Sequence, residues 1–444
     1  MNNLNLEEFD AIVIGGGPAG LSAANQLVKE GKKSLLINST TANGLGIGGL
    51  ANEWHNQCAE FEDVDFNSLD NFSSWPISHM EYRAYAEKAK KMLGIEINHN
   101  NEITAKSGNL TKDNFCIDEV ETIISKKTKW EDLFSSTLQN PLVTIHDGTV
   151  SKITHNNQVI NGIVLDGSEI TMKENTNIYL AAGCVGNTEI LTRSNFLVLN
   201  GSKVHSRYLA DHPMFENIHL KGGNRNKFAA LFENKTANNK NFLKKRKYRV
   251  RKNGKNLGVF EIRHFFTNRS IDNTLDKLLL SECIKGSVNK LFNITFKIII
   301  FRPLLTRVWI QLAQELNSDS RIVVENNSTS IIWTLSEKDL KNYFDIIQAV
   351  QMLAEKKGFT LHCSKKVKTV AELESTALSA FHLSGTTRMS KKEIDSVVDK
   401  NGKLFDIDNC YILGSSVFTT PSWVNPTLSI MALSIRTVEK SWLH

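Results

Sequence analysis

Two polar residues near the C-terminus stand in turns of the kind that face a ligand. His382 lies in FHLSGTTRM (Phe381–Met389), and Asn425 lies in SWVNPTLS. The Gly, Ser and Thr residues around each favour turns over regular core elements. A histidine, with an ordinary pKa of about 6.5, acts as a general base around neutral pH. Taken alone, His382 would be better explained as a hydrogen-bonded structural histidine, so a catalytic role depends on the residues around it.

The other end of the chain has the pattern of a dinucleotide-binding turn. Ala11–Ile14 is typical of a buried strand, and Gly15, Gly17 and Gly20 follow it at GxGxxG spacing. In this pattern the first glycine permits a tight turn, the second lets the backbone approach a pyrophosphate, and the third lets the helix pack closely. The N-terminus of that helix then faces the phosphate charge. Together with the chemistry expected of His382, this predicts a flavoprotein with a general base.

The second predicted strand, Ser34–Ile37, is followed by Asn38, where this fold usually has Asp or Glu for the ribose hydroxyls. Asparagine still accepts a hydrogen bond through its carbonyl oxygen but has no charge, so we expect weaker ribose anchoring. The alternative is that Asn38 is only a turn residue. Further on, the adjacent Gly48 and Gly49 allow a close backbone approach to a flat ligand.

From Gly48 onward the sequence resembles the glucose–methanol–choline (GMC) oxidoreductases. The resemblance is thin between about Met214 and Ala313 and covers most of the rest in order. The matching elements are GG-x-x-N-x-W (Gly48, Gly49, Asn52 and Trp54), WP (Trp75 and Pro76), IYLAAGCVGNTEIL, RYLADHP, HLSGTTRM, LGSSVFTT and NPTLSIMAL.

This resemblance implies an α/β fold with two domains. A discontinuous Rossmann-like FAD-binding domain would comprise residues 1–213 and 380–444. An α+β substrate-binding domain carrying an antiparallel sheet would comprise residues 214–379. The length of 444 residues also favours two domains over one core.

The resemblance implies further contacts with FAD. Val150 would lie beside the adenine. Ala182 and Gly183 would approach the cofactor after a strand, and Gly414 and Ser415 would approach its ribityl chain and phosphate. Members with covalent FAD carry a histidine just before the tryptophan of GG-x-x-N-x-W, whereas this chain has Glu53 there. We therefore expect non-covalent FAD.

A helix is predicted to open at Asn425-Pro426-Thr427, because Asn is a good N-cap and Pro suits a first turn. The resemblance implies that Pro426 and Thr427 bring this helix end to the flavin, where its dipole would stabilise the reduced form. His382 occupies the position of the family's active-site histidine and would be the base. Asn425 would orient the substrate oxygen. His212, in ADHP, is interpreted as structural.

The formal net charge of +6 comes from one segment. Residues 240–255 hold nine Lys and Arg and no acid. Such a run is a solvated face, a site for an anionic substrate, or a contact with an anionic membrane surface. No nucleic-acid-binding pattern accompanies it. The apolar stretch 291–310 is interrupted by three basic residues and a proline, which favours a buried element over an interfacial membrane segment.

The expected substrate is a small alcohol, polyol or sugar. The six scattered cysteines show no metal-ligand spacing, and no metal site is expected. The polar N-terminus lacks the pattern of a signal peptide, which favours a cytoplasmic protein. Two other functions stay open: a non-catalytic flavin-binding protein with an assembly or regulatory role, and a dehydrogenase using only a nicotinamide.

Overall fold

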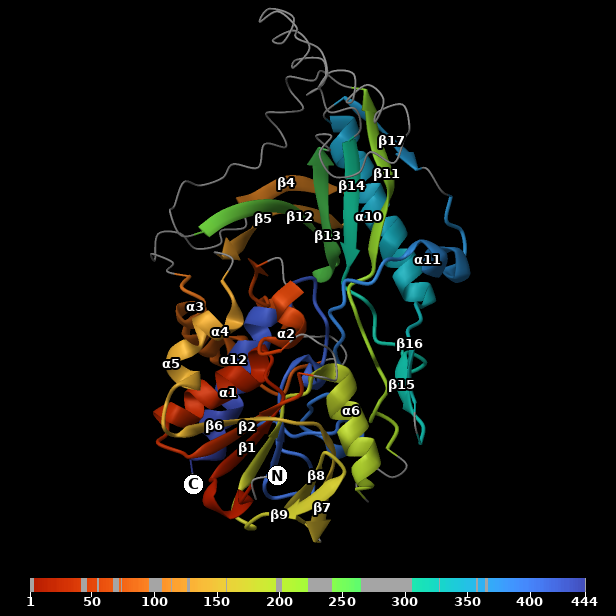
Figure 1. Cartoon of the computed structure of the whole chain (residues 1–444). Coiled ribbons are helices and arrows are strands. Elements are labelled where there is room, and N and C mark those ends of the chain that lie inside the picture. Colours follow the sequence, from red (N-terminus) through yellow and green to blue (C-terminus); the bar gives the residue numbers. More distant parts are fainter. Residues whose placement is uncertain are drawn as a thin grey trace, which may run out of the picture.

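The computed structural model of the chain has two halves, each built around its own sheet (Figure 1). A parallel sheet lies in the lower half of the view and a large antiparallel sheet in the upper half. The structure describes residues 4–40, 46–53, 56–66, 72, 74–95, 106–112, 114–125, 128–156, 158–196, 202–222, 242–264, 306–326, 328–356, 358–363 and 366–443.

The parallel sheet has five strands in the order β18-β10-β1-β2-β6. In four of the five strands, β1, β2, β10 and β18, nearly every residue is buried, as expected where both faces of a parallel sheet are covered. The order steps outward in both directions from β1, which is typical of a doubly wound nucleotide-binding sheet. The strands are β1 (Ala11–Ile14), β2 (Ser34–Asn38), β6 (Val143–Asp147), β10 (Asn177–Leu180) and β18 (Cys410–Ile412).

Three helices from distant parts of the chain pack together beside this sheet. Helix α12 contacts both α1 and α3. The contact brings the C-terminal helix onto the helix that follows the N-terminal glycine turn. The helices are α1 (Pro18–Lys29), α3 (His79–Met92) and α12 (Thr427–Ser441), and the shorter α4 (Trp130–Leu133) and α5 (Ser135–Leu138) lie nearby in Figure 1.

The chain between β6 and β10 forms a three-stranded antiparallel sheet. It consists of β7 (Val150–Asn156), β8 (Val159–Leu165) and β9 (Ser168–Thr171). The strand before it, β6, joins the parallel sheet instead, through β2. Helix α6 (Gly183–Ser194) packs against β7.

The antiparallel sheet has eight strands and includes strands from both sides of residue 214. Its order is β17-β11-β14-β13-β12-β5-β3, with β4 paired to β5. Its strands are β3 (Gln57–Cys58), β4 (Lys106–Lys112), β5 (Phe115–Ser125), β11 (Met214–Gly222), β12 (Phe242–Lys252), β13 (Lys255–His264), β14 (Thr306–Leu312) and β17 (Phe359–Cys363). The described end of the apolar stretch 291–310 thus lies in strand β14, and residues 291–305 lie outside the described part.

The two faces of this sheet differ. Helix α10 (Glu337–Lys356) covers one face and forms a second core with it, to which Val250 and Phe260 contribute. The opposite face turns toward the lower half, where Val259 joins the first core. Polar residues on that face, among them Arg249 and Gln311, are also buried. This polar face is where the antiparallel sheet meets the loops of the half built on the parallel sheet.

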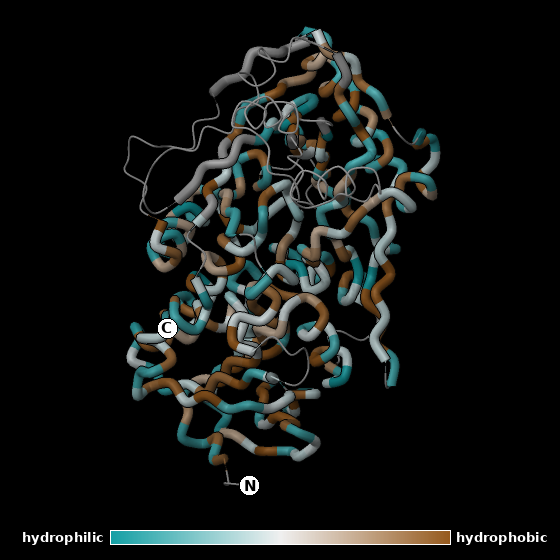
Figure 2. Tube along the Cα trace, turned by 45° about the horizontal axis from the view of Figure 1, so that its top comes forward, coloured by the Kyte–Doolittle hydropathy of each residue, from teal (hydrophilic) through white to brown (hydrophobic). Residues whose placement is uncertain are grey.

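Figure 2 shows hydrophobic stretches running through the interior of the lower half, where the parallel sheet lies. Outside these sheets lie a separate hairpin of β15 (Arg321–Val324) and β16 (Thr329–Ile332) and two short helices, α2 (Asp63–Phe66) and α11 (Val370–Thr376). Across the described residues, every helix is too short or too polar to cross a membrane. The α/β fold with a Rossmann-like sheet and a second antiparallel sheet is as predicted.

Candidate active site

The glycine turn after β1 has the geometry that a dinucleotide needs. Gly15 has a φ of +115°, and a Cβ there would lie 2.4 Å from the Ala181 carbonyl oxygen. A Cβ on Gly20 would lie 1.8 Å from the Gly15 oxygen, so the helix packs directly on the turn. Gly17 is the N-cap of α1 and provides no side-chain cap. The first amides of α1 are therefore placed to meet a phosphate.

Asn38 uses its two side-chain polar atoms in different ways. Its oxygen accepts a hydrogen bond from Gly16 N at 3.0 Å. Its amide nitrogen is buried and has no hydrogen-bond partner within the described chain. The amide nitrogen is thus a donor left for a ribose hydroxyl, in addition to the carbonyl oxygen on which the prediction relied. An unsatisfied buried donor beside the glycine turn fits a bound FAD, because burying such a group without a partner is costly.

The second glycine pair packs on the first turn. Gly48 N donates to Gly16 O at 2.8 Å, and a Cβ built on Gly49 would lie 3.7 Å from the Gly17 Cα. Asn52 donates to the Ile47 carbonyl at 2.9 Å and so holds the Gly48 turn from within. Trp54 and His55 lie outside the described residues.

Three other predicted cofactor segments converge on the same region. Gly183, with a φ of +75°, opens α6, and a Cβ on Gly414 would lie 3.9 Å from Ala19 in α1. Val150 is buried at the start of β7. Just before it, the backbone N of Gly148 donates to the backbone carbonyl oxygen of Asn38 at 3.3 Å.

Asn187 holds two of these turns together, and the sequence reasoning missed it. Its oxygen accepts from Ala182 N at 2.9 Å, and its nitrogen donates to Leu413 O and Ser416 Oγ. Its place inside the matched element IYLAAGCVGNTEIL was the one available signal.

The histidine loop is tied directly to this cofactor region. Gly385 N donates to Ser415 O at 3.1 Å, and Ser415 Oγ donates to Leu383 O at 2.6 Å. His382 itself is half-buried, and its backbone N donates to Asp211 Oδ1 at 2.9 Å. The structure therefore brings His382 to the turn that carries Gly414 and Ser415.

His212, interpreted from the sequence as structural, is a direct partner of His382. The two Nδ1 atoms are 2.9 Å apart, and the rings are nearly perpendicular, at 82°. His212 is 1% exposed, and its Nε2 lies 3.0 Å from the Pro421 carbonyl oxygen. Burial lowers its pKa, against the opposing effects of the Asp211 charge and the Pro421 carbonyl.

Asn425 lies on the same C-terminal loop that His212 contacts. Gln311 links the two sides, because its amide nitrogen reaches both His212 Nδ1, at 3.0 Å, and the Trp423 carbonyl, at 2.9 Å. The helix after the loop begins at Thr427, with Pro426 at the N-cap position and no side-chain cap. The expectation that Asn425 caps this helix is wrong, since Pro426 takes that position in a helical conformation.

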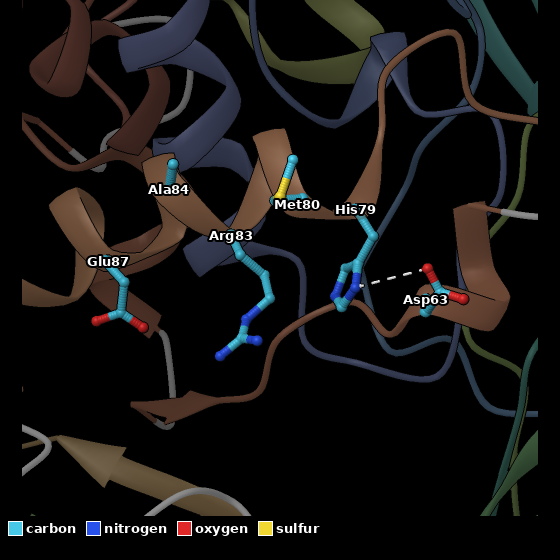
Figure 3. Close-up of a pocket in the computed structure, with 6 residues that line it drawn as sticks. All are labelled: Asp63, His79, Met80, Arg83, Ala84 and Glu87. Carbon is cyan, nitrogen blue, oxygen red and sulfur yellow. Dashed lines mark ion pairs between the residues drawn. The ribbon is translucent and has the colours of Figure 1, made fainter. Parts of the chain in front are cut away.

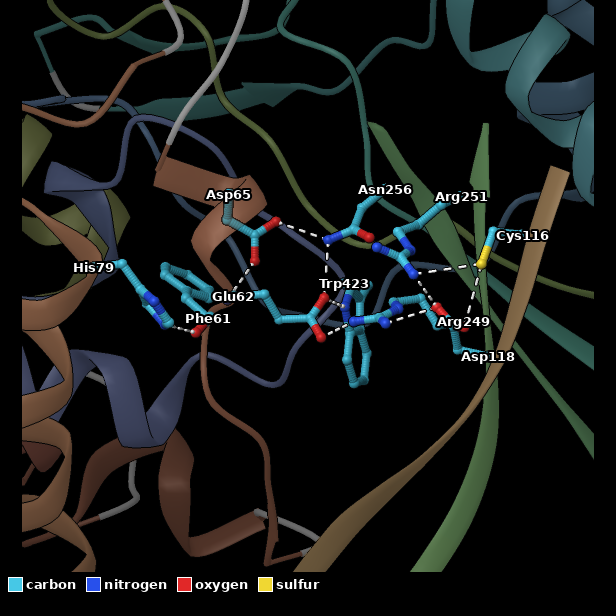
Figure 4. A network of polar contacts seen from close by, with 10 residues as sticks. All are labelled: Phe61, Glu62, Asp65, His79, Cys116, Asp118, Arg249, Arg251, Asn256 and Trp423. Carbon is cyan, nitrogen blue, oxygen red and sulfur yellow. Dashed lines mark hydrogen bonds and ion pairs between the residues drawn. The ribbon is translucent and has the colours of Figure 1, made fainter. Parts of the chain in front are cut away.

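A buried polar network joins the antiparallel sheet to the same loop (Figure 4). Glu62 pairs with Arg249 and accepts from Asn256 at 3.1 Å and from the Trp423 indole at 3.3 Å. Asp118 pairs with Arg249 at 2.7 Å and with Arg251 at 2.5 Å. These contacts hold the segment before Asn425 against strands β12 and β13.

Much of the basic segment 240–255 is therefore neutralised within the molecule. Besides Arg249 and Arg251, Lys252 pairs with Asp345 at 2.7 Å and Lys255 with Glu315 at 2.6 Å. Lys240 and the side chains of Lys244, Lys245 and Arg246 lie outside the described residues.

A separate surface hollow of about 370 Å³ lies along α3 (Figure 3). Its residues are Asp63, His79, Met80, Arg83, Ala84 and Glu87. None of the predicted site residues lines it. Within the described part of the chain, no group of three or more His, Cys, Asp and Glu is arranged to hold a metal, and the five described cysteines are free thiols.

Comparison with known families agrees with the fold and the turns. Residues 10–51 match the model of a FAD binding domain, and residues 318–434 match the model of GMC oxidoreductase. Together with the sheet topology and the glycine turns, these matches define a FAD-binding oxidoreductase. The matched C-terminal part of the chain is similar to that of the GMC oxidoreductases, and the cofactor of the chain is FAD.

Curated relatives match over short stretches. The chain is 38% identical over 90 residues to thiamine thiazole synthase of Archaeoglobus fulgidus, which is 20% of this chain and 33% of the relative. It is 41% identical over 61 residues to 6'''-hydroxyparomomycin C oxidase of Streptomyces lividus, which is 14% of this chain and 11% of the relative. It is 27% identical over 141 residues to paromamine 6'-oxidase of Streptomyces fradiae, which is 30% of this chain and 25% of the relative. The aligned stretches thus span a third or less of these relatives.

Solved structures resemble the chain over nearly its whole length. Pyridoxine 4-oxidase from Mesorbium loti has a TM-score of 0.58, with 98% of this chain and 100% of that chain covered. Formate oxidase from Aspergillus oryzae RIB40 has a TM-score of 0.56, with 99% and 98% covered. At 13% identity each, they establish the fold.

Proposed function

We propose that this protein oxidises a CH–OH group of a small alcohol or sugar to a carbonyl, with His382 as the general base. One observation carries the proposal. The loop of His382 is hydrogen-bonded to the Ser415 turn, and the neighbouring Gly414 lies against the first turn of α1. These contacts place the histidine loop beside the turns that would hold the cofactor.

The residues that would hold FAD are those of the converging turns. Gly15, Gly17 and Gly20 would receive the pyrophosphate at the start of α1, and the Asn38 amide would donate to a ribose hydroxyl. Other contacts would come from Gly48, Gly49, Asn52, Val150, Ala182, Gly183, Gly414, Ser415, Pro426 and Thr427. Glu53, in place of a histidine, supports non-covalent binding. When bound, FAD supplies the acceptor for the hydride that leaves the carbinol carbon.

The protein's own part is to take a proton and place an oxygen. Neutral His382 would accept the hydroxyl proton, and Asn425 would hold the substrate oxygen from the loop that contacts His212. Helix α12 starts without a side-chain cap, so its first amides remain available for an electron-rich edge. Such a fixed dipole acts without reorganisation during the reaction.

A neutral alcohol, polyol or sugar is the substrate class that the described residues support. Two relatives are named 6'''-hydroxyparomomycin C oxidase and paromamine 6'-oxidase, and a third is named 2-methyl-1,2-propanediol dehydrogenase. The basic segment, which suggested an anionic substrate or a membrane surface, has Arg249, Arg251, Lys252 and Lys255 paired to carboxylates. A paired cation is a weak attractant for a second anion.

The test is an anaerobic screen of the FAD-loaded protein with sugars, polyols and sugar phosphates, each followed by loss of the oxidised flavin absorbance. We expect bleaching by at least one neutral polyol or sugar. A protein that takes up FAD and is bleached by none of them would favour the alternative, a flavin-binding assembly or regulatory protein. A protein that refuses FAD contradicts the proposal outright.

A further inference from the structure

His212 sits between the two halves of the molecule and is almost fully buried. Three groups surround its ring: the Pro421 carbonyl at Nε2, and both His382 Nδ1 and the Gln311 amide at Nδ1. Each of these neighbours restricts which ring nitrogen can carry a proton, and together they determine the tautomer of both histidines.

The Nε2 atom of His212 carries a proton. The Pro421 carbonyl oxygen, 3.0 Å away, only accepts hydrogen bonds, so the ring nitrogen facing it must donate. A neutral imidazole has one proton, and its second nitrogen is then an acceptor. Nδ1 of His212 is that acceptor.

The Gln311 side chain agrees with this assignment. Its amide nitrogen is the atom facing the Trp423 carbonyl at 2.9 Å, which fixes the orientation of the amide. The same nitrogen faces His212 Nδ1 at 3.0 Å and donates to it. A second proton on His212 would point at this donor. Burial opposes it as well, by lowering the pKa of His212.

The state of His382 follows. Its Nδ1 lies 2.9 Å from the same acceptor atom, and two bare lone pairs at that distance would repel each other. The single proton of neutral His382 is therefore on Nδ1, and His382 and the Gln311 amide share the one lone pair of His212 Nδ1. The lone pair of His382 is then on Nε2. Asp211 fixes the relation of the two rings, because one of its oxygens accepts from the backbone N of both His382 and His212.

We propose that His212 is a positioning residue for alcohol oxidation, which holds the proton of His382 on Nδ1 and thereby makes Nε2 the atom that accepts the substrate proton. The inference rests on the proposed role of His382 as base. In the step, the substrate O–H bond breaks, an N–H bond forms at His382 Nε2, and the new imidazolium keeps its Nδ1–H bond to neutral His212. A neutral acceptor stabilises that cation without adding a charge.

The direct test is the protonation state of the two rings in protein labelled with ¹⁵N-histidine. We expect the nitrogen shifts of neutral His382 to show Nδ1–H and those of His212 to show Nε2–H, with the two sets of signals assigned by His382→Asn and His212→Asn. A neutral His382 with its proton on Nε2 would overturn the inference, whatever the activity.

Kinetics of the FAD-loaded protein give an independent readout. His212→Leu should slow anaerobic flavin reduction about ten- to a hundredfold, with unchanged affinity for FAD. It should also move the ascending limb of the pH profile to lower pH, because the imidazolium loses its acceptor. His212→Asn, whose side-chain oxygen can accept from His382, should recover part of the rate. His205→Asn is the matched control, since His205 bonds Thr192 in α6 and lies outside this site.

The two proposals fail in different ways. Flavin reduction that depends on His382 but is unchanged in His212→Leu would refute the positioning role and leave the proposed function intact. If the two histidines show the predicted protonation states but no alcohol reduces the flavin, the proposed function is refuted and the inferred positions of the protons still hold.

Discussion

The side-chain oxygen of Asn38 accepts a hydrogen bond from the backbone N–H of Gly16 at 3.0 Å. The end of β2 is thereby joined to the glycine turn after β1, and the Asn38 amide nitrogen is left buried without a partner among the described residues. An acidic residue in its place would offer acceptors alone. Asparagine has both an oxygen that accepts from the Gly16 N–H and an amide N–H group that can donate to the cofactor.

Asn38→Ala should weaken FAD binding about 5- to 100-fold, because it removes two hydrogen bonds that each contribute about 0.5–1.5 kcal/mol. Asn25→Ala is the control. Asn25 is in α1 and bonds Thr137, away from the glycine turn. Titration of both apo-proteins with FAD, followed by flavin fluorescence, measures the difference. Equal affinities in the two variants would show that Asn38 is only a turn residue.

Two glycines of the same turn should respond differently to alanine. A Cβ at Gly20 would overlap the Gly15 oxygen at 1.8 Å, so Gly20→Ala should fail to fold. A Cβ at Gly17 meets no atom closer than 3.9 Å, and Gly17 has an ordinary φ of −79°. Gly17→Ala should keep its unfolding free energy within about 1 kcal/mol and still lose FAD affinity about tenfold or more, since the methyl group occupies the phosphate approach. Wild-type affinity in Gly17→Ala would place the cofactor elsewhere.

Arg249 should be the costliest of the described basic-segment cations to neutralise. It is buried, and burial lowers its pKa to about 10. Arg249→Met leaves the Glu62 carboxylate without its cation and should cost about 3–5 kcal/mol of unfolding free energy. Lys255→Met, at an exposed pair with Glu315, should cost less than about 1 kcal/mol. Urea denaturation compares them, and similar losses would mean that the buried network contributes nothing beyond a surface pair.

Asp65 should make stability fall as pH rises. Burial raises its pKa from 3.8 to about 6, against the opposing effects of the Ser422 hydroxyl, the Asn256 amide and His79. The folded protein therefore binds this proton more tightly than the unfolded chain does between about pH 4 and pH 6, and the penalty for the buried carboxylate is complete above that window.

Asp65→Asn removes that penalty, so relative to wild type it should gain about 3 kcal/mol of unfolding free energy between pH 4 and pH 7, at 1.36 kcal/mol for each pKa unit. The comparison uses the change with pH, because constant differences in hydrogen bonding cancel. A difference that stays flat across this range would show that Asp65 is ionised in the folded state throughout.

The sequence predicted those features that short-range patterns determine. The glycine spacing with its flanking strands located the dinucleotide turn, and the motifs around His382 and Asn425 located the two loops. Asn425 itself was misjudged as a helix cap, since local preference ranks Asn above Pro at that position while the chain starts the helix one residue later.

Other features depend on partners far apart in the chain and left no local signal. His212 is 170 residues from His382, and Glu62 meets Trp423 across 361 residues. The charges of the basic segment looked available from composition alone, because their carboxylate partners, such as Asp118, come from a strand over a hundred residues earlier. Only the folded arrangement of β5 beside β12 reveals the pairing.

The most direct measurement of the central claim is the rate of anaerobic flavin reduction by the best alcohol found, in wild type and in His382→Asn, with FAD affinity determined for both. The account predicts that the rate in His382→Asn falls by about 10²–10⁴, while FAD affinity and the unfolding transition stay at wild-type values. His205→Asn should reduce its flavin at the wild-type rate. Wild-type reduction in His382→Asn would contradict the account, because the substrate proton would then have another acceptor.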